Sequence, residues 1–104
     1  ICWFQNGITD SWASNLKIMP CLNFIKGTCC PHYDEEPERR PAVKKFLQSN
    51  KTKDVFAVDG GAALHIKDEK IFKSVVFRNE KSSYLVSYDG KKINEKSFKK
   101  IKLI

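Results

Sequence analysis

The chain has 104 residues, of which 41% are hydrophobic and 12% aromatic, and its formal net charge at pH 7 is +7. This length allows one small domain, and the apolar and aromatic content excludes a disordered chain. No apolar run approaches the roughly 20 residues that a membrane-spanning helix needs, so a transmembrane protein is excluded and we expect a soluble one.

The N-terminal part of the chain predicts the end of a helix followed by short extended segments. Residues 1–4 (ICWF) are apolar throughout and are soon followed by Gly7, which is typical of the last turn of a buried helix. Residues 9–15 are polar and turn-like. Residues 21–25 and 28–30 are short apolar runs on either side of Gly27, and we interpret them as buried extended segments.

A helix is predicted from Glu38 onward. Pro37 and Pro41 are compatible with a helix only near its first turn, where backbone N–H groups have no partner inside the helix. Acidic residues before the helix and lysines further along it follow the order that the helix dipole favours. The inward-facing stripe with helical spacing consists of Val43, Phe46 and Leu47.

Strands dominate the rest of the chain. Residues 55–58 (VFAV) are continuously apolar, as in a strand covered on both faces, and this run stops at Asp59-Gly60-Gly61. Strand-like patterns follow at 62–66, 71–77, 84–88 and 91–93, with a hairpin signal at Asp89-Gly90. The order of these elements predicts an α/β fold, namely the second half of an open sheet with an antiparallel β appendage. The first strands of such a sheet, which would cover the other side of residues 55–58, are not in this sequence.

The C-terminal segment is strongly basic. From Lys91 onward there are six lysines and one glutamate, a net charge of +5. A basic patch can bind nucleic acid. These lysines alternate with apolar residues and lack interleaved arginines, so we favour a solvated edge strand protected by lysine and expect no nucleic-acid partner.

The four cysteines, Cys2, Cys21, Cys29 and Cys30, contain no C-x-x-C pair. Together with His32 they could in principle hold zinc, but the ligand spacing of zinc sites is absent. We interpret them as reduced thiols in a cytosolic protein and expect no metal and no cofactor.

Two polar residues stand where predicted strands end: His32 after residues 28–30, and Asp59 after residues 55–58. In open α/β sheets the functional groups gather beyond the carboxyl ends of the strands. A histidine can transfer a proton near neutral pH, and a carboxylate can orient it. Both residues also have structural alternatives. His32 would then be a structural histidine with its hydrogen bonds made inside the protein, and Asp59 would be a turn residue before two glycines. Gly60 would let the backbone pass close to a ligand, and Tyr33 could touch substrate or pack inside.

A nucleophile is missing from this set. No serine lies in a G-x-S-x-G setting. A Cys–His pair is conceivable because Cys29 and Cys30 are close to His32 in sequence. However, neither cysteine has a helix N-terminus that would lower its pKa.

Three segments, "ICWFQNGITDS", "GTCCPHYDEEPERRPA" and "VFAVDGGAALHI", in this order and spacing closely resemble the peptidase E family of serine peptidases, in particular its Gram-positive branch. The resemblance covers nearly the whole chain and is weakest in the lysine-rich tail. It implies a class I glutamine amidotransferase-like (flavodoxin-like) fold, a three-layer open sheet. It also implies a serine nucleophile in a G-x-S-A-G motif immediately before Ile1, so that the chain would be the C-terminal part of a single domain.

The resemblance also assigns roles to residues. It places the general base at His32 and the third triad member at Asp59, with Asp10 as a competing candidate. An arginine early in the following helix would bind the substrate carboxylate. The strictly equivalent position holds Glu38, and Arg39 and Arg40 follow it by one and two residues.

The implied function is a cytoplasmic, cofactor-free serine peptidase acting on short peptides, with N-terminal aspartyl dipeptides as the substrate class. Its expected partners are the peptide and the N-terminal half of the same domain, and a homodimer is a further option. The alternative hypothesis is a non-catalytic fragment or pseudoenzyme that binds a partner through its basic tail.

Overall fold

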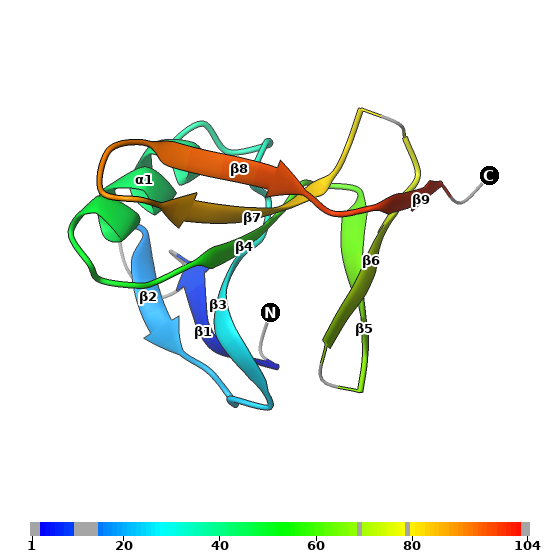
Figure 1. Cartoon of the computed structure of the whole chain (residues 1–104), viewed down its shortest axis with the longest axis horizontal. Coiled ribbons are helices and arrows are strands. Elements are labelled where there is room, and N and C mark those ends of the chain that lie inside the picture. The colour runs from blue at the N-terminus through cyan, green and yellow to red at the C-terminus, as the bar shows by residue number, and fades with distance from the viewer. Residues whose placement is uncertain (1–2, 10–14, 69, 79, 103–104) are drawn as a thin grey trace.

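The computed structural model describes residues 3–9, 15–68, 70–78 and 80–102 (Figure 1). Within these ranges the chain forms two mixed β-sheets and one helix. This is an α/β arrangement compatible with the predicted open-sheet class. In the same ranges no helix is long and apolar enough to span a bilayer.

The larger sheet has six strands in the order β2-β1-β3-β4-β7-β8. Their bounds, in sheet order, are Lys17–Pro20, Phe4–Thr9, Ile25–Cys30, Val55–Val58, Ser83–Tyr88 and Ile93–Ser97. Strands β1, β3 and β4 run parallel to one another, and the other pairs are antiparallel. Because β3 and β4 are parallel neighbours, the loops that follow them leave the sheet at the same end.

Helix α1, Arg39–Gln48, covers one face of this sheet (Figure 1). It begins directly after Glu38, as predicted, with Pro41 in its first turn. Two residues of the predicted stripe, Val43 and Leu47, are buried, and Phe46 packs at the margin. The fully buried cluster under the helix consists of Ile8, Cys30, Tyr33, Val43, Leu47, Val55, Ala57 and Val86.

The opposite face of the larger sheet carries the alternate residues of the same strands. Val55 and Ala57 of β4 face the helix, so Phe56 and Val58 point to the other side. On that side Phe56 contacts Phe4 and Phe98, with ring centroids 5.5 and 6.1 Å apart. Strand β4 is therefore covered on both faces, which confirms the interpretation of its continuous apolar run.

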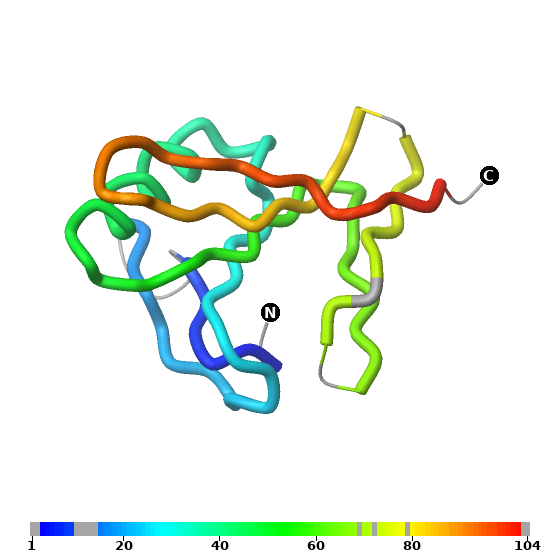
Figure 2. Tube along the Cα trace, in the orientation of Figure 1, coloured from blue at the N-terminus to red at the C-terminus, as the bar shows by residue number. Residues whose placement is uncertain are grey.

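The smaller sheet has the order β5-β6-β9, with bounds Ala62–Lys67, Lys70–Val76 and Lys100–Lys102. β5 and β6 form an antiparallel hairpin, and β9 pairs with β6 in parallel. Figure 2 shows the chain passing from the β7–β8 hairpin of the larger sheet into β9 of the smaller one. All three residues of β9 are exposed, so the predicted lysine-rich edge strand is confirmed.

Four expectations from the sequence are wrong. The predicted antiparallel appendage is one of them, because β7 and β8 belong to the larger sheet and β9 pairs with β6 in parallel. Residues 1–2 lie outside the described ranges, and Phe4 begins strand β1 instead of ending a helix, because β1 is paired on both sides by β2 and β3. Residues 21–24 are not in a strand, which starts at Ile25. Strand β8 starts at Ile93 and not at Lys91, because the N–H groups of residues 91 and 92 both donate to Asp89 Oδ1 at 2.9 Å and form the turn.

Candidate active site

His32 stands just beyond the carboxyl end of β3, in a tight turn. Its backbone φ of +53° lies in the left-handed region, which non-glycine residues seldom adopt. The N–H groups of Glu35 and Glu36 donate to its carbonyl oxygen at 3.2 and 3.4 Å. This turn brings Glu35 back toward the imidazole, and the His32 Nδ1 to Glu35 Oε1 distance is 2.7 Å. The imidazole is exposed, and through this Nδ1 contact a carboxylate already orients the ring.

Asp59 stands beyond the carboxyl end of β4 and is only 5% exposed. Its Oδ2 accepts a hydrogen bond from the Ser82 N–H at 2.9 Å, and its own N–H donates to the Ser82 carbonyl at 3.0 Å. Oδ1 is buried and has no hydrogen-bond partner among the described residues. Burial raises the pKa of Asp59 above the usual carboxyl value, against the opposing effect of the Ser82 N–H. The site therefore contains a buried carboxylate oxygen that lacks a donor.

Direct bonds join the loops that carry these two residues. The Tyr33 N–H donates to the Val58 carbonyl at 3.0 Å, and the Gly60 N–H donates to Asp34 Oδ1 at 2.8 Å. Lys81 forms an ion pair with Asp34. Although burial alone would raise it, the bonds from Lys81 and Gly60 lower the pKa of Asp34. His32 and Asp59 thus lie on adjoining loops, although His32 contacts Glu35 and not Asp59.

Gly60 lies against the end of the exposed and flexible Glu35 side chain, which would have to move aside for any larger residue at this position. A Cβ atom at Gly60 would collide with the Glu35 carboxylate. Beside the two loops lies an open hollow of about 330 Å³, whose lining includes Gly60, Arg78 and Lys81. The Glu35 carboxylate also lines this hollow, and Lys81 is paired with Asp34, so the hollow carries charges of both signs. Asp10, the competing acid, lies outside the described residues.

The two arginines have different environments. Arg39 is 4% exposed, and its Nη1 donates to the Ile8 carbonyl at 2.8 Å while Nε and Nη2 contact Glu36 Oε1 at 3.0 Å. Arg40 is half exposed and makes a bidentate contact with Glu95, at 3.0 and 2.9 Å. Arg39 is therefore already engaged inside the protein, and Arg40 is the more accessible of the two.

Tyr33 is buried beneath Arg40. The Arg40 Cζ atom lies 4.4 Å above the centre of the Tyr33 ring, and the Tyr33 hydroxyl donates to Glu95. Burial, together with this bond, raises the pKa of Tyr33, and the Glu95 carboxylate raises the pKa of Arg40. In this arrangement an arginine and a phenol together hold one carboxylate, which belongs to β8.

The cysteines near His32 are poor nucleophiles. Cys29 and Cys30 are both buried, and burial raises the pKa of Cys29 to about 12 and that of Cys30 to about 11. Both are therefore neutral thiols at physiological pH, which argues against a Cys–His pair. In the described part of the chain, no group of three or more His, Cys, Asp or Glu residues could hold a metal ion.

Sequence reasoning missed four residues of this region: Glu35, Asp34, Lys81 and Glu95. A signal was present only for Glu35, which follows His32 by three residues in a turn. The contacts of Lys81 and Glu95 connect positions far apart in the sequence. No local pattern indicates such contacts.

Comparisons with known proteins give two matches and one negative result. The sequence profile of peptidase family S51 matches residues 1–74. The "uncharacterized peptidase YgaJ" of Bacillus subtilis (strain 168) is 41% identical over 86 residues, which cover 83% of this chain and 37% of that protein. The chain thus spans well under half the length of this curated relative. No solved structure gives a significant match.

Proposed function

Because this chain belongs to peptidase family S51, in agreement with its resemblance to the peptidase E family, we propose that it forms part of a serine peptidase. Its substrates would be short peptides, with N-terminal aspartyl dipeptides as the first class to test, and its location the cytoplasm. The family match favours this function over that of a non-catalytic module binding through the basic C-terminal tail.

The observation that carries the proposal is the placement of His32 and Asp59. They follow two neighbouring parallel strands, β3 and β4, and the Tyr33 N–H to Val58 carbonyl bond ties their loops together. Beyond the carboxyl ends of such strands lies the usual place of catalytic groups in open α/β sheets. The nucleophile would be a serine outside these 104 residues, and His32 would take its proton as general base.

The third member of the triad would be Asp59 or Asp10. The buried Oδ1 of Asp59 needs a hydrogen-bond donor, and an imidazole N–H turned toward it would supply one. Glu35, which already holds His32 Nδ1, is a further candidate for the orienting acid. Arg40 would bind the substrate carboxylate after releasing Glu95, because a guanidinium binds carboxylates in a bidentate manner. Arg39, Tyr33 and Gly60 would shape the surrounding site.

The segment that carries the serine would also cover apolar surface. Leu22 and Phe24 are two residues apart in the chain and are 60% and 61% exposed. Such exposure is unusual for two large apolar side chains this close together in the sequence. We propose that further elements of the same domain pack over them.

The test is the variant His32→Ala in the longer protein that contains the serine. Its kcat on aspartyl dipeptides should fall by about 10²–10⁴-fold or more, the usual contribution of a general base. His65→Ala is the matched control, because His65 is an exposed histidine on β5 and its loss should leave kcat within about twofold. Undiminished activity in His32→Ala, with the fold intact by circular dichroism, would reject the proposal. Separate variants Asp59→Asn, Asp10→Asn and Glu35→Gln would identify the orienting acid.

A further inference from the structure

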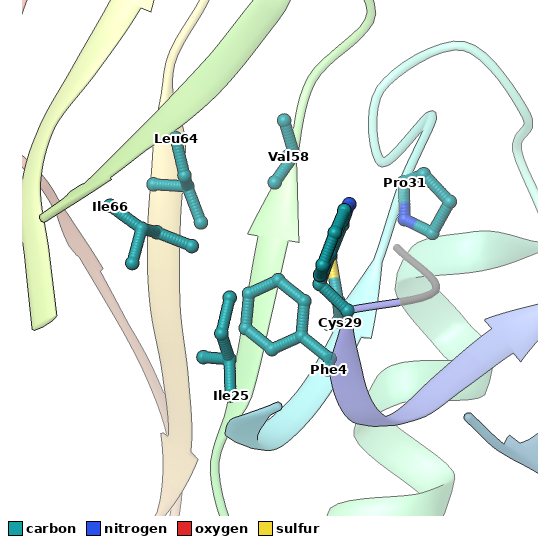
Figure 3. Close-up of a pocket in the computed structure, with 8 residues that line it drawn as sticks. Phe4, Ile25, Cys29, Pro31, Val58, Leu64 and Ile66 are labelled. Atoms are coloured by element: carbon teal, nitrogen blue, oxygen red, sulfur yellow. The ribbon is translucent and has the colours of Figure 1, made fainter. Parts of the chain in front are cut away.

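An apolar cavity of about 240 Å³ lies between the two sheets (Figure 3). Phe4, Ile25 and Cys29 line it from the larger sheet, and Leu64 and Ile66 line it from β5. Figure 3 shows the side chains of both sheets pointing into this common space.

The lining of the cavity is mostly apolar, and the strand pattern explains why. Along β5 the residues alternate, with Leu64 and Ile66 half-buried toward the cavity and Ala63 and His65 exposed on the other face. Cys29 also contributes a neutral group, because its thiol stays protonated at physiological pH. A cavity lined in this way binds apolar groups in preference to water.

The cavity also lies next to the candidate catalytic residues. Two of its lining residues, Pro31 and Val58, immediately precede His32 and Asp59. The backbone that carries His32 and Asp59 therefore also borders the cavity.

We propose that this cavity is a specificity site for one apolar side chain of the peptide substrate, of the size of leucine or phenylalanine. This inference rests on the proposed function and deepens it. The size fits, because an engineered apolar cavity of about 150 Å³ accepts benzene. Burying a leucine side chain is worth about tenfold or more in affinity compared with glycine, which has no side chain to bury.

The test measures binding and needs no turnover. The 104-residue chain contains two tryptophans, so the variant Trp12→Phe leaves Trp3, which lines the cavity, as the single tryptophan reporter. Titration with N-acetyl-leucinamide should change the Trp3 fluorescence at concentrations about tenfold or more below those needed for N-acetyl-glycinamide. Methyl NMR of the unaltered chain should show the largest shifts at Val58, Leu64 and Ile66.

A pair of variants on β5 locates the site. Leu64→Asn keeps the approximate shape but places a polar group in the cavity, and should weaken binding of the leucine probe about tenfold. Ala63→Asn, on the exposed face of the same strand, should leave it unchanged. Circular dichroism and the urea midpoint establish that both variants fold, and the NMR result does not depend on either.

Equal or absent binding of both probes, or shifts away from the cavity, would overturn the proposal. So would self-association of the chain that depends on Leu64, since a second copy would then occupy the cavity. In the longer protein, equal kcat/KM on Asp-Leu and Asp-Gly would overturn the specificity site while the peptidase stands. In that longer protein, tight binding of the leucine probe without hydrolysis of any peptide would instead reject the proposed peptidase.

Discussion

Replacing Arg39 by methionine should destabilise the domain by about 1–4 kcal/mol. Arg39 Nη1 donates to the carbonyl of Ile8, a residue with no exposed surface, at 2.8 Å. Removing a donor from a buried acceptor costs about 1–3 kcal/mol. The ion pair with Glu36 adds at most about 1 kcal/mol, because Glu36 is partly solvated. Methionine keeps most of the apolar contacts of the arginine stem. The decrease in the free energy of unfolding therefore reflects mainly the lost hydrogen bonds and the lost ion pair.

Arg40→Met is the matched control from the next position of the same helix. Arg40 is 49% exposed and its ion pair with Glu95 is partly solvated. We therefore expect this variant to lower the free energy of unfolding by about 0–1 kcal/mol. Urea unfolding at pH 7, followed by circular dichroism, measures both, and unchanged m-values would show that the unfolded states are comparable. If Arg39→Met lowers the free energy of unfolding no more than Arg40→Met does, a stabilising role of the buried Arg39 hydrogen bonds is refuted.

Three more outcomes are expected. Burial raises the pKa of Asp59, so the folded chain binds this proton more tightly than the unfolded chain and the carboxyl costs stability above its folded pKa. Asp59→Asn should therefore raise the urea midpoint at pH 7, with a gain that disappears as the pH falls below the usual carboxyl range; a gain that persists there would contradict the reasoning. Cys29 and Cys30 should react with a chromogenic disulfide reagent at pH 8 far more slowly than the half-buried Cys21, and equal rates in the folded chain would be evidence against their burial. Leu47→Ala should cost about 2–5 kcal/mol, whereas the exposed Leu22→Ala should stay within about 0.5 kcal/mol in the 104-residue chain, and calorimetry would expose any reversal of this order.

The elements that the sequence predicts well are those whose signals are local. Residues 55–58 form β4 with the predicted bounds, because the apolar run is closed by Asp54 and Asp59. The start of α1 follows from its prolines. By contrast, a four-residue apolar run such as ICWF fits either a helix end or a strand. Phe4 begins a strand because β1 pairs with β2 and β3, and these pairings cannot be read from the run itself.

The candidate site shows the same limit. The positions of His32 and Asp59 at strand ends could be predicted, because parallel strands place their following loops together. The sequence analysis offered Arg39 for the substrate carboxylate, but it precedes Val43 by four residues and is buried on the inward stripe of the helix. The pairing of Arg40 with Glu95 was not, because it requires the β7–β8 hairpin to be placed beside α1. The three-residue spacing of His32 and Glu35 is a local signal for their contact, but the left-handed backbone conformation of His32 that completes it is not indicated by any residue pattern.

From the parallel pairing of β9 with β6 we expect completion of the smaller sheet to be a late event in folding. The β5–β6 and β7–β8 hairpins are local, and such units form in about 1–10 μs. The β7–β8 hairpin separates β6 from β9 in the sequence. We therefore expect β9 to pair with β6 only after that hairpin has packed into the larger sheet. Until then β6 presents an unpaired edge, which is a site of association between partly folded chains. Refolding at high concentration should therefore favour association of partly folded chains. Slow dilution from denaturant should give a better yield of folded protein than refolding at high concentration.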